Sequence, residues 1–370
     1  MTAVLTCITT TILAQNPCYR MTIMPRAALS NNTTKMRVPF ELKQGQSRHF
    51  HKLPSGLKME FIFQKGHLLD KKENNSENPP IVFVHGSFHA AWCWAEHWLP
   101  FFSHHGFDCY ALSLLGQGES DSPSGAVAGS LQTHAADVAD FIHKEIQLPP
   151  VLMGHSFGGL IVQYYLAYSG SDKLREKEAL HPYLAGAVLV CSVPPSGNSG
   201  LVWRYLFSKP IAAFKVTRSL AAKAFQTSLP LCKETFFSAA MEDHLVLRYQ
   251  KLMTESSRLP LFDLRKLNAS LPVPPLKDSS TKILVLGAND DFIVVTKTPL
   301  FQYFSTFYRN NLISRIFITK TSITIKLFHL RRLGCLNYES YDFFRMPRDL
   351  VKQVGFTTFH LFALMELPMT

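Results

Sequence analysis

A serine flanked by glycines is the clearest candidate for chemistry in the chain. The run GHSFG, residues 154–158, has Ser156 at its centre and follows an apolar stretch that is typical of a buried strand. Glycines two positions before and after a serine leave room for a tight strand-to-helix turn that exposes the hydroxyl. The amide of Phe157 would then lie at a helix N-terminus, where an N–H group can stabilise an oxyanion. The spacing therefore predicts Ser156 as a nucleophile.

Two other strand ends carry groups that would serve such a nucleophile. Ser87 and Phe88 follow an apolar strand upstream of the serine, and the amide of either is expected to be a second oxyanion donor. His85 precedes them and is interpreted as structural. Asp290 and Asp291 follow the last clear strand, where a carboxylate would orient a catalytic imidazole. Asp291 is favoured because an apolar run follows it; the alternative is a turn with two exposed acids.

Strands and helices alternate through the middle of the chain. Apolar stretches predict strands at residues 81–85, 107–112, 151–155, 184–191 and 283–287, an edge strand at residues 57–63, and helices at residues 131–146 and from residue 160. This alternation predicts an α/β fold, a mostly parallel sheet with helices on both faces. Residues 193–280 break the rhythm and are expected to form a helical cap over the carboxyl ends of the strands.

Composition and charge exclude several classes of protein. The chain has 370 residues, of which 46% are hydrophobic and 18% charged, and this excludes an intrinsically disordered protein. The chain has no run of about 18 apolar residues, so no transmembrane helix is predicted. The net charge is +11, with +7 on residues 1–59, −2 on residues 60–296 and +6 on residues 297–370. Because the excess lies at the two ends, no nucleic-acid partner is expected.

The N-terminal 40 residues have the composition of an organelle transit peptide. They contain no Asp or Glu, nine Ser or Thr and four Lys or Arg. We therefore expect residues 1–45 to be a transit peptide or a disordered N-terminus, and we expect the chloroplast as the location, with the mitochondrion or the cytoplasm as alternatives. The seven cysteines are scattered, with no CxxC pair and no metal-ligand spacing, and this pattern predicts buried free thiols.

Four segments together resemble the α/β-hydrolase superfamily. They are VFVHGSFHAAWCW (82–94), LLGQGES (114–120), LMGHSFGG (152–159) and ILVLGANDD (283–291). The first is similar to the plant methylesterase and hydroxynitrile-lyase branch. The resemblance implies an α/β-hydrolase domain over residues 46–297, with its cap at about 193–280, a Ser-Asp-His triad and no metal or cofactor. Ser113 stands where the family usually has an Asp, which we interpret as neutral for the chemistry.

In this chain no histidine stands at the position that is usual for the base of that triad. The imidazole takes the serine proton and returns it to the leaving group, yet residues 292–327 contain no histidine. His329 and His360 follow, neither of them beside a glycine. Three hypotheses stay open: His329 is the base, His360 is the base, or the ordinary C-terminal segment is absent. The last is favoured because residues 298–370, an atypical C-terminal segment, are basic and lack a clear period.

The function that follows is hydrolysis of a carboxylic ester, a small molecule with an apolar or lipid-like group. The apolar group is expected because the cap is rich in Phe and Leu and contains Trp203. The alternative is a catalytically impaired protein of the same fold that binds a small molecule, and a third hypothesis is hydroxynitrile lyase activity. The sequence does not indicate an oligomeric state.

Overall fold

The computed structural model describes eight stretches of the chain. They are residues 39–67, 78–169, 181–197, 210–237, 241–276, 281–288, 313–318 and 323–327. All of them belong to one unit, Thr33–Thr370.

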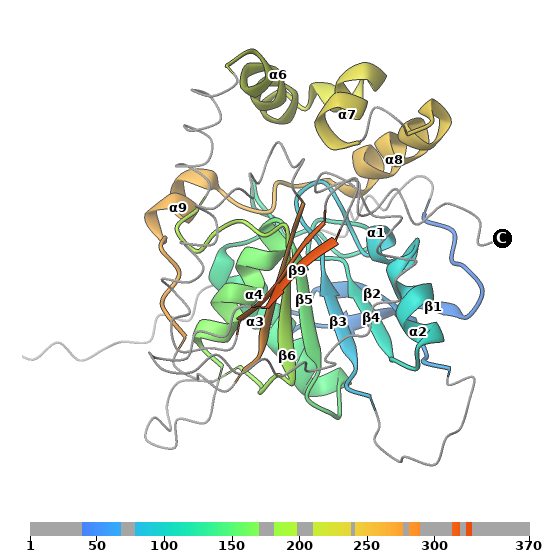
Figure 1. Ribbon diagram of the computed structural model, residues 1–370, viewed down its shortest axis with the longest axis vertical. Coiled ribbons are helices and arrows are strands. Elements are labelled where there is room, and N and C mark those ends of the chain that lie inside the picture. The colour runs from blue at the N-terminus through green and yellow to red at the C-terminus, as the bar shows by residue number, and fades with distance from the viewer. Residues whose placement is uncertain are drawn as a thin grey trace, which may run out of the picture. The chain divides into compact units, whose positions relative to one another are not determined.

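A single sheet of nine strands organises the described residues (Figure 1). Its strands are β1 (Gln46–Lys52), β2 (Lys58–Gln64), β3 (Ile81–Val84), β4 (Cys109–Leu112), β5 (Val151–His155), β6 (Gly186–Val190), β7 (Ile283–Ala288), β8 (Ile313–Ile318) and β9 (Ile323–Leu327). Their order in the sheet is β1-β2-β4-β3-β5-β6-β7-β8-β9. The pairs from β4 to β8 are parallel, and the pairs at both edges are antiparallel. The predicted mostly parallel sheet is confirmed.

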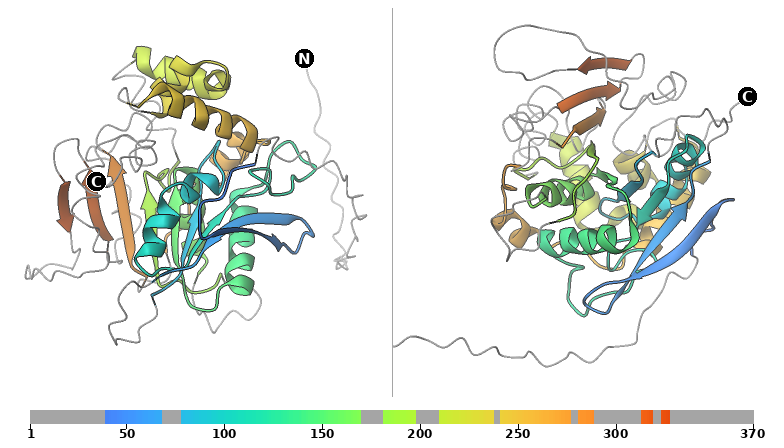
Figure 2. Two further views of the ribbon diagram at one scale, coloured as in Figure 1. Left: turned by 90° about the vertical axis from the view of Figure 1, so that its right-hand side faces the viewer. Right: turned by 90° about the horizontal axis from the view of Figure 1, so that it is seen from below.

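Helices cover both faces of this sheet. They are α1 (Trp92–Ala95), α2 (Trp98–His104), α3 (Leu131–Glu145) and α4 (Phe157–Ala167). Figures 1 and 2 show α1 and α2 on one side and α3 and α4 on the other. Each side has its own buried cluster. Trp94 of α1 and Trp98 of α2 belong to one cluster, and Val138 of α3 and Leu160 of α4 belong to the other. Burial of these apolar surfaces is the main stabilising contribution to such a layered fold.

The prediction for residues 57–63 was wrong in one respect. They form β2, which is not an edge strand because β1 pairs with its outer side, Gln46 opposite Gln64. The segment QSRHFHK of β1 has no apolar alternation, and its side chains are half-buried or exposed except His51. Charged and polar residues are typical of edge strands, where they discourage pairing with another chain. That composition hid the strand from a search for apolar runs.

The described residues between β6 and β7 are mainly helical, and together these helices are termed the cap. Its described helices are α6 (Pro210–Ala221), η1 (Ala224–Gln226), α7 (Leu229–Phe236), α8 (Asp243–Ser256) and α9 (Leu264–Ala269). Figure 1 shows α6, α7 and α8 together at one end of the sheet. Contacts of the loop after β3 with Phe225 and Phe236 identify it as the carboxyl end of the parallel strands. None of the helices in the described stretches has the length and apolar character required to span a membrane.

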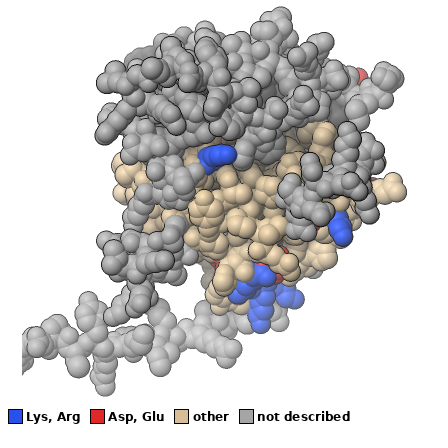
Figure 3. Space-filling model, turned by 60° about the horizontal axis from the view of Figure 1, so that its bottom comes forward, with Lys and Arg blue, Asp and Glu red and all other residues tan. Residues whose placement is uncertain are grey.

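The described cysteines lie in the protein interior. Cys93, Cys109 and Cys232 are buried free thiols, as predicted, and Cys191 is also buried. On the face drawn in Figure 3, the described Lys and Arg side chains form a few separate spots in a mostly uncharged surface.

Asp137 gives the folded protein a specific pH dependence. Burial, helped by the neighbouring Asp140, raises the pKa of Asp137 on α3 to about 7, and the charge of His51 only partly opposes this. His51 itself lies between Asp140 (2.8 Å) and Glu145 (2.7 Å), and Lys144 binds Asp140. A raised carboxyl pKa means that the folded state holds the proton more tightly, so its stabilising contribution is complete below about pH 4 and is lost as the pH rises through about 7.

Asp137→Asn is therefore expected to gain stability relative to wild type as the pH rises from 4 to 8, by about 3 kcal/mol. Urea unfolding at several pH values measures the difference. The exposed substitution Glu41→Gln provides the control, and a difference between Asp137→Asn and wild type that is constant with pH would contradict the assignment.

Candidate active site

Ser156 occupies the strained turn that the glycine spacing predicts. It joins β5 to α4 with φ 53° and ψ −120°, a conformation that non-glycine residues rarely adopt. Its amide donates to the carbonyl of Val190 at 3.1 Å, and its carbonyl accepts the amide of Val193 at 3.1 Å. The end of β6 thus holds the turn in place. Strain at a residue fixed from both sides is a feature of functional positions.

Glycine is required in this turn because backbone atoms approach it closely. A Cβ on Gly154 would lie 2.5 Å from the carbonyl oxygen of Gly158. A Cβ on Gly158 would collide with the carbonyl oxygens of Val84 and His85, and one on Gly86 would lie 2.9 Å from the Ser156 Cβ. The end of β3 and the serine turn are therefore in direct contact.

Gly158→Ala is expected to destabilise the protein by at least about 3 kcal/mol, because two backbone carbonyls cannot move away as a flexible side chain would. Chemical denaturation measures the loss. Gly125→Ala is the matched control, since its Cβ would come no closer than 3.5 Å to any atom. Equal stability of the two variants would show that the close approach is absent.

The candidate oxyanion loop is oriented by two buried histidines. Nδ1 of His85 lies 2.7 Å from the Gly86 carbonyl oxygen, and Nε2 accepts the amide of Leu114 at 3.0 Å. Nδ1 of His89 lies 2.8 Å from the Ser87 carbonyl oxygen. Burial lowers the pKa of His85 to about 3 and that of His89 to about 4, so both rings are neutral at physiological pH.

The two histidines determine where the loop amides point. In a planar trans peptide the N–H is directed away from the preceding carbonyl. Since the carbonyls of Gly86 and Ser87 face the histidines, the amides of Ser87 and Phe88 face the opposite way. The amide of Phe157 is in the first turn of α4, where N–H groups lack partners within the helix. The N–H groups of Ser87 and Phe88 therefore lie on the side of the loop away from the two histidines, and His85 contacts the loop backbone at Gly86.

The predicted acid and base residues lie outside the described residues. These are Asp290, Asp291, His329 and His360, and Trp203 of the cap also lies outside them. β7 ends at Ala288 and lies one strand beyond β6, which in turn lies beside the serine strand β5. Within the described residues, no group of three or more His, Cys, Asp and Glu is placed to hold a metal ion.

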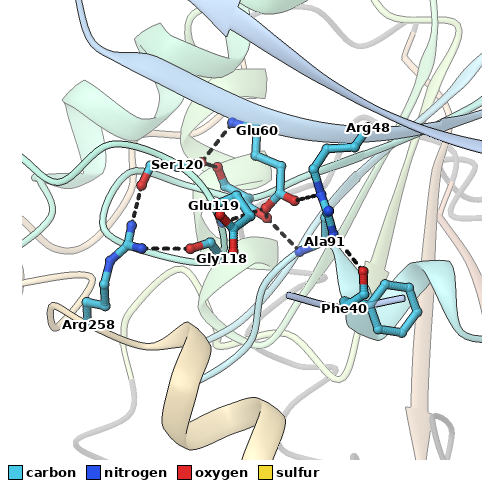
Figure 4. A network of polar contacts seen from close by, with 9 residues as sticks. Phe40, Arg48, Glu60, Ala91, Gly118, Glu119, Ser120 and Arg258 are labelled. Atoms are coloured by element: carbon cyan, nitrogen blue, oxygen red, sulfur yellow. Dashed lines mark hydrogen bonds and ion pairs between the residues drawn. The ribbon is translucent and has the colours of Figure 1, made fainter. Parts of the chain in front are cut away.

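A buried carboxylate supports the loops next to the site. Ser113 donates its hydroxyl to Glu60 Oε2 at 2.7 Å and accepts the amide of Ala91 at 2.9 Å. Glu60, only 3% exposed, also accepts Arg48 Nε at 2.7 Å and the amide of Glu119 at 2.8 Å (Figure 4). Ser113 stands where the family that this chain resembles usually has an Asp. Here the carboxylate of Glu60, on β2, lies against the Ser113 hydroxyl.

Residues at the end of α8 bind the same loops. Arg258 donates to the carbonyls of Gly118, at 2.9 Å, and Ser120 (Figure 4). The amide of Gly118 donates to the Ser256 carbonyl at 2.9 Å, and the indole N–H of Trp92 donates to the Ser256 hydroxyl at 3.1 Å. The end of α8 therefore has a fixed place beside the site.

Sequence reasoning missed Glu60, Gln163 and Arg258. Gln163, fully buried on α4, donates to the Ser192 hydroxyl at 2.9 Å and to the Val193 carbonyl at 2.8 Å, which stabilises the end of β6 beside the serine. A lone Gln in an apolar helix was an available signal, because a buried amide needs partners. Ser113 lies 53 residues from its partner Glu60, and Gly118 lies 140 residues from its partner Arg258, so no local pattern indicated these contacts.

Comparison with known proteins assigns the chain to a family. The model of the alpha/beta hydrolase family matches residues 81–314, which is more than half of the chain. The chain belongs to this family. Two curated relatives are a non-heme chloroperoxidase of Streptomyces lividans, 36% identical over 116 residues, and a putative chloroplastic methylesterase 15 of Arabidopsis thaliana, 31% identical over 109 residues. The matches cover 31% and 28% of this chain but only 37% and 23% of those proteins.

Solved structures include an esterase from Exiguobacterium antarcticum. It has 15% sequence identity and a TM-score of 0.48, and the match covers 72% of this chain and 89% of that chain.

Proposed function

We propose that this protein is a serine hydrolase that cleaves carboxylic esters. The observation that carries the proposal is the backbone of Ser156, held at φ 53° between β5 and α4 with the oxyanion loop in contact with it. Membership of the alpha/beta hydrolase family and the similarity to a methylesterase support the same reaction class.

The proposed reaction proceeds in two stages. Ser156 Oγ attacks the ester carbonyl carbon while its proton passes to a histidine, and the oxyanion accepts hydrogen bonds from the amides of Phe157 and of Ser87 or Phe88. The histidine returns the proton to the leaving alcohol, which produces an acyl-enzyme. Water, activated by the same histidine, then releases the acid and restores the serine.

The histidine and its acid are proposed from the sequence. His329 is the proposed base, with His360 as the alternative, and Asp291 or Asp290 is the acid that orients it. The substrate is proposed to carry an apolar or lipid-like group, because the loop after β3 faces a cap region that contains the buried rings of Phe225, Phe236 and Phe237.

Hydrolysis of p-nitrophenyl esters with acyl chains of two to twelve carbons tests both points. We expect turnover that increases with chain length up to the capacity of the site, and loss of turnover in His329→Ala but not in the exposed control His244→Ala. No hydrolysis of any ester by the folded protein would contradict the proposal.

A binding protein without turnover is the second candidate function. The absence of histidine from residues 292–327 favours it, since without a base the serine hydroxyl is a weak nucleophile. Such a protein would bind an apolar ester with unchanged affinity in Ser156→Ala, and isothermal titration with a non-hydrolysable ether analogue would detect it.

A chloroplast location is proposed from residues 1–40 and from the chloroplastic relatives. Fusion of residues 1–45 to a fluorescent protein tests it: import into isolated chloroplasts is expected, and uptake by mitochondria or by neither organelle would contradict it.

A further inference from the structure

Phe88 has a backbone conformation that its residue type disfavours. Its φ is 66°, in the left-handed region, and it lies in the candidate oxyanion loop directly after Ser87. A bulky residue keeps such a conformation only when its surroundings hold it there. The contacts of the Phe88 ring therefore bear on the position of the loop amides.

The cap supplies those contacts. The Phe88 ring packs edge-on against Phe225 of η1, with centroids 4.9 Å apart, and lies 6.2 Å from Phe236 of α7. Phe225 and Phe236 are themselves fully buried and pack edge-on against each other at 4.8 Å. Edge-on pairs of buried rings have a preferred geometry, so the rings of Phe225 and Phe236 fix the direction of the Phe88 side chain.

The neighbouring His89 reaches the cap by a second route. Its ring stacks on Trp92 at 5.4 Å, Trp92 stacks on Tyr249 of α8 at 6.0 Å, and Tyr249 stacks on Phe237 at 5.8 Å. Two consecutive loop residues are thus connected to two different parts of the cap, and the peptide of Phe88 is held between them.

We propose that the cap positions the oxyanion loop through Phe88, so that the cap must be docked for the proposed esterase to react at full rate. This inference rests on the proposed function. Phe88 would act as a positioning residue: its ring fixes the peptide that carries one candidate oxyanion donor. Stabilisation of an oxyanion depends steeply on donor placement, so a small shift of this peptide would lower kcat more than it would weaken substrate binding.

A double-mutant cycle between the loop and the cap tests the coupling. The variants are Phe88→Leu, Phe225→Leu and the double substitution, with Phe63→Leu as the control. Phe63 is also half-buried and packs against an aromatic ring, Tyr110 at 4.8 Å, but it lies on β2. Each variant of the full chain is assayed for kcat and KM on an ester, for the rate of phosphonylation by a fluorophosphonate, and for melting temperature.

We expect Phe88→Leu and Phe225→Leu each to lower kcat and the phosphonylation rate by about 10- to 100-fold with little change in KM. The double variant should be no more than about threefold slower than the slower single variant, because both remove the same contact. Phe63→Leu should lower the melting temperature while keeping kcat within about twofold of wild type. Phe88→Gly relieves the strain and should remain slow all the same.

Two results would overturn the inference in distinguishable ways. If wild type reacts and the two substitutions multiply independently, or Phe63→Leu slows the reaction equally, the cap does not act through Phe88. If wild type neither hydrolyses esters nor takes the label, the proposed function fails and the inference fails with it.

Discussion

Ser156→Ala is expected to lower kcat for ester hydrolysis by at least about 10⁴-fold. Loss of the nucleophile from a triad removes the covalent route entirely, and only binding and the oxyanion donors remain. The folded structure should survive, because the backbone contacts that hold the turn come from the amide and carbonyl of residue 156 and not from its side chain. KM or the affinity for a substrate analogue should change by less than about threefold.

The matched control is Ser122→Ala, a serine whose hydroxyl contacts Arg258 at 3.3 Å outside the turn. Kinetics on the ester that wild type hydrolyses fastest, together with circular dichroism of each variant, provide the measurement. Retention of more than a few per cent of wild-type turnover by Ser156→Ala would remove Ser156 from the mechanism.

Glu60→Gln is expected to cost about 3–5 kcal/mol of the free energy of unfolding. The buried carboxylate accepts hydrogen bonds from Arg48, Ser113 and the Glu119 amide, and its loss leaves the guanidinium without its charge partner. The new amide group would also place a donor where the wild type has only acceptors. Urea denaturation measures the loss, and Glu41→Gln, at an exposed position, should change stability by less than about 0.5 kcal/mol.

A second substitution separates loss of charge from loss of fit. Ser113→Asp alone should also destabilise, because it places two carboxylates side by side. Combined with Glu60→Gln, it returns one carboxylate to the same polar cluster and should restore at least half of the lost stability. If the double variant is as unstable as the sum of the singles, the cluster does not require a carboxylate at this point.

Local pattern was sufficient for the serine turn and for the parallel strands up to β7, whereas β8 (Ile313–Ile318) was not predicted. Ser156 was predictable because the glycines that permit its φ lie within two residues of it. The strands β3, β5 and β6 were predictable because parallel strands buried on both faces are continuous apolar runs. For these elements the residues that determine the structure are close together in the sequence.

Elements that depend on distant partners were not predictable in this way. β1 is stabilised by pairing with β2 and by His51, which binds Asp140 and Glu145 some 90 residues away. The helices α1 and α2 are short and aromatic, and they are stabilised by packing of Trp94 and Trp98 against Phe83 of β3, not by their own periodicity. The link from Phe88 to Phe225 likewise spans more than 130 residues.

The most direct test of the proposed mechanism is labelling of the full chain with a fluorophosphonate followed by peptide mass spectrometry. The reagent forms a covalent bond only with a serine whose hydroxyl is activated and whose site can hold the oxyanion. We predict one phosphonylated peptide, which contains Ser156, and no label on Ser156→Ala. Correctly folded wild type that takes no label, or takes it at another serine, would contradict the account.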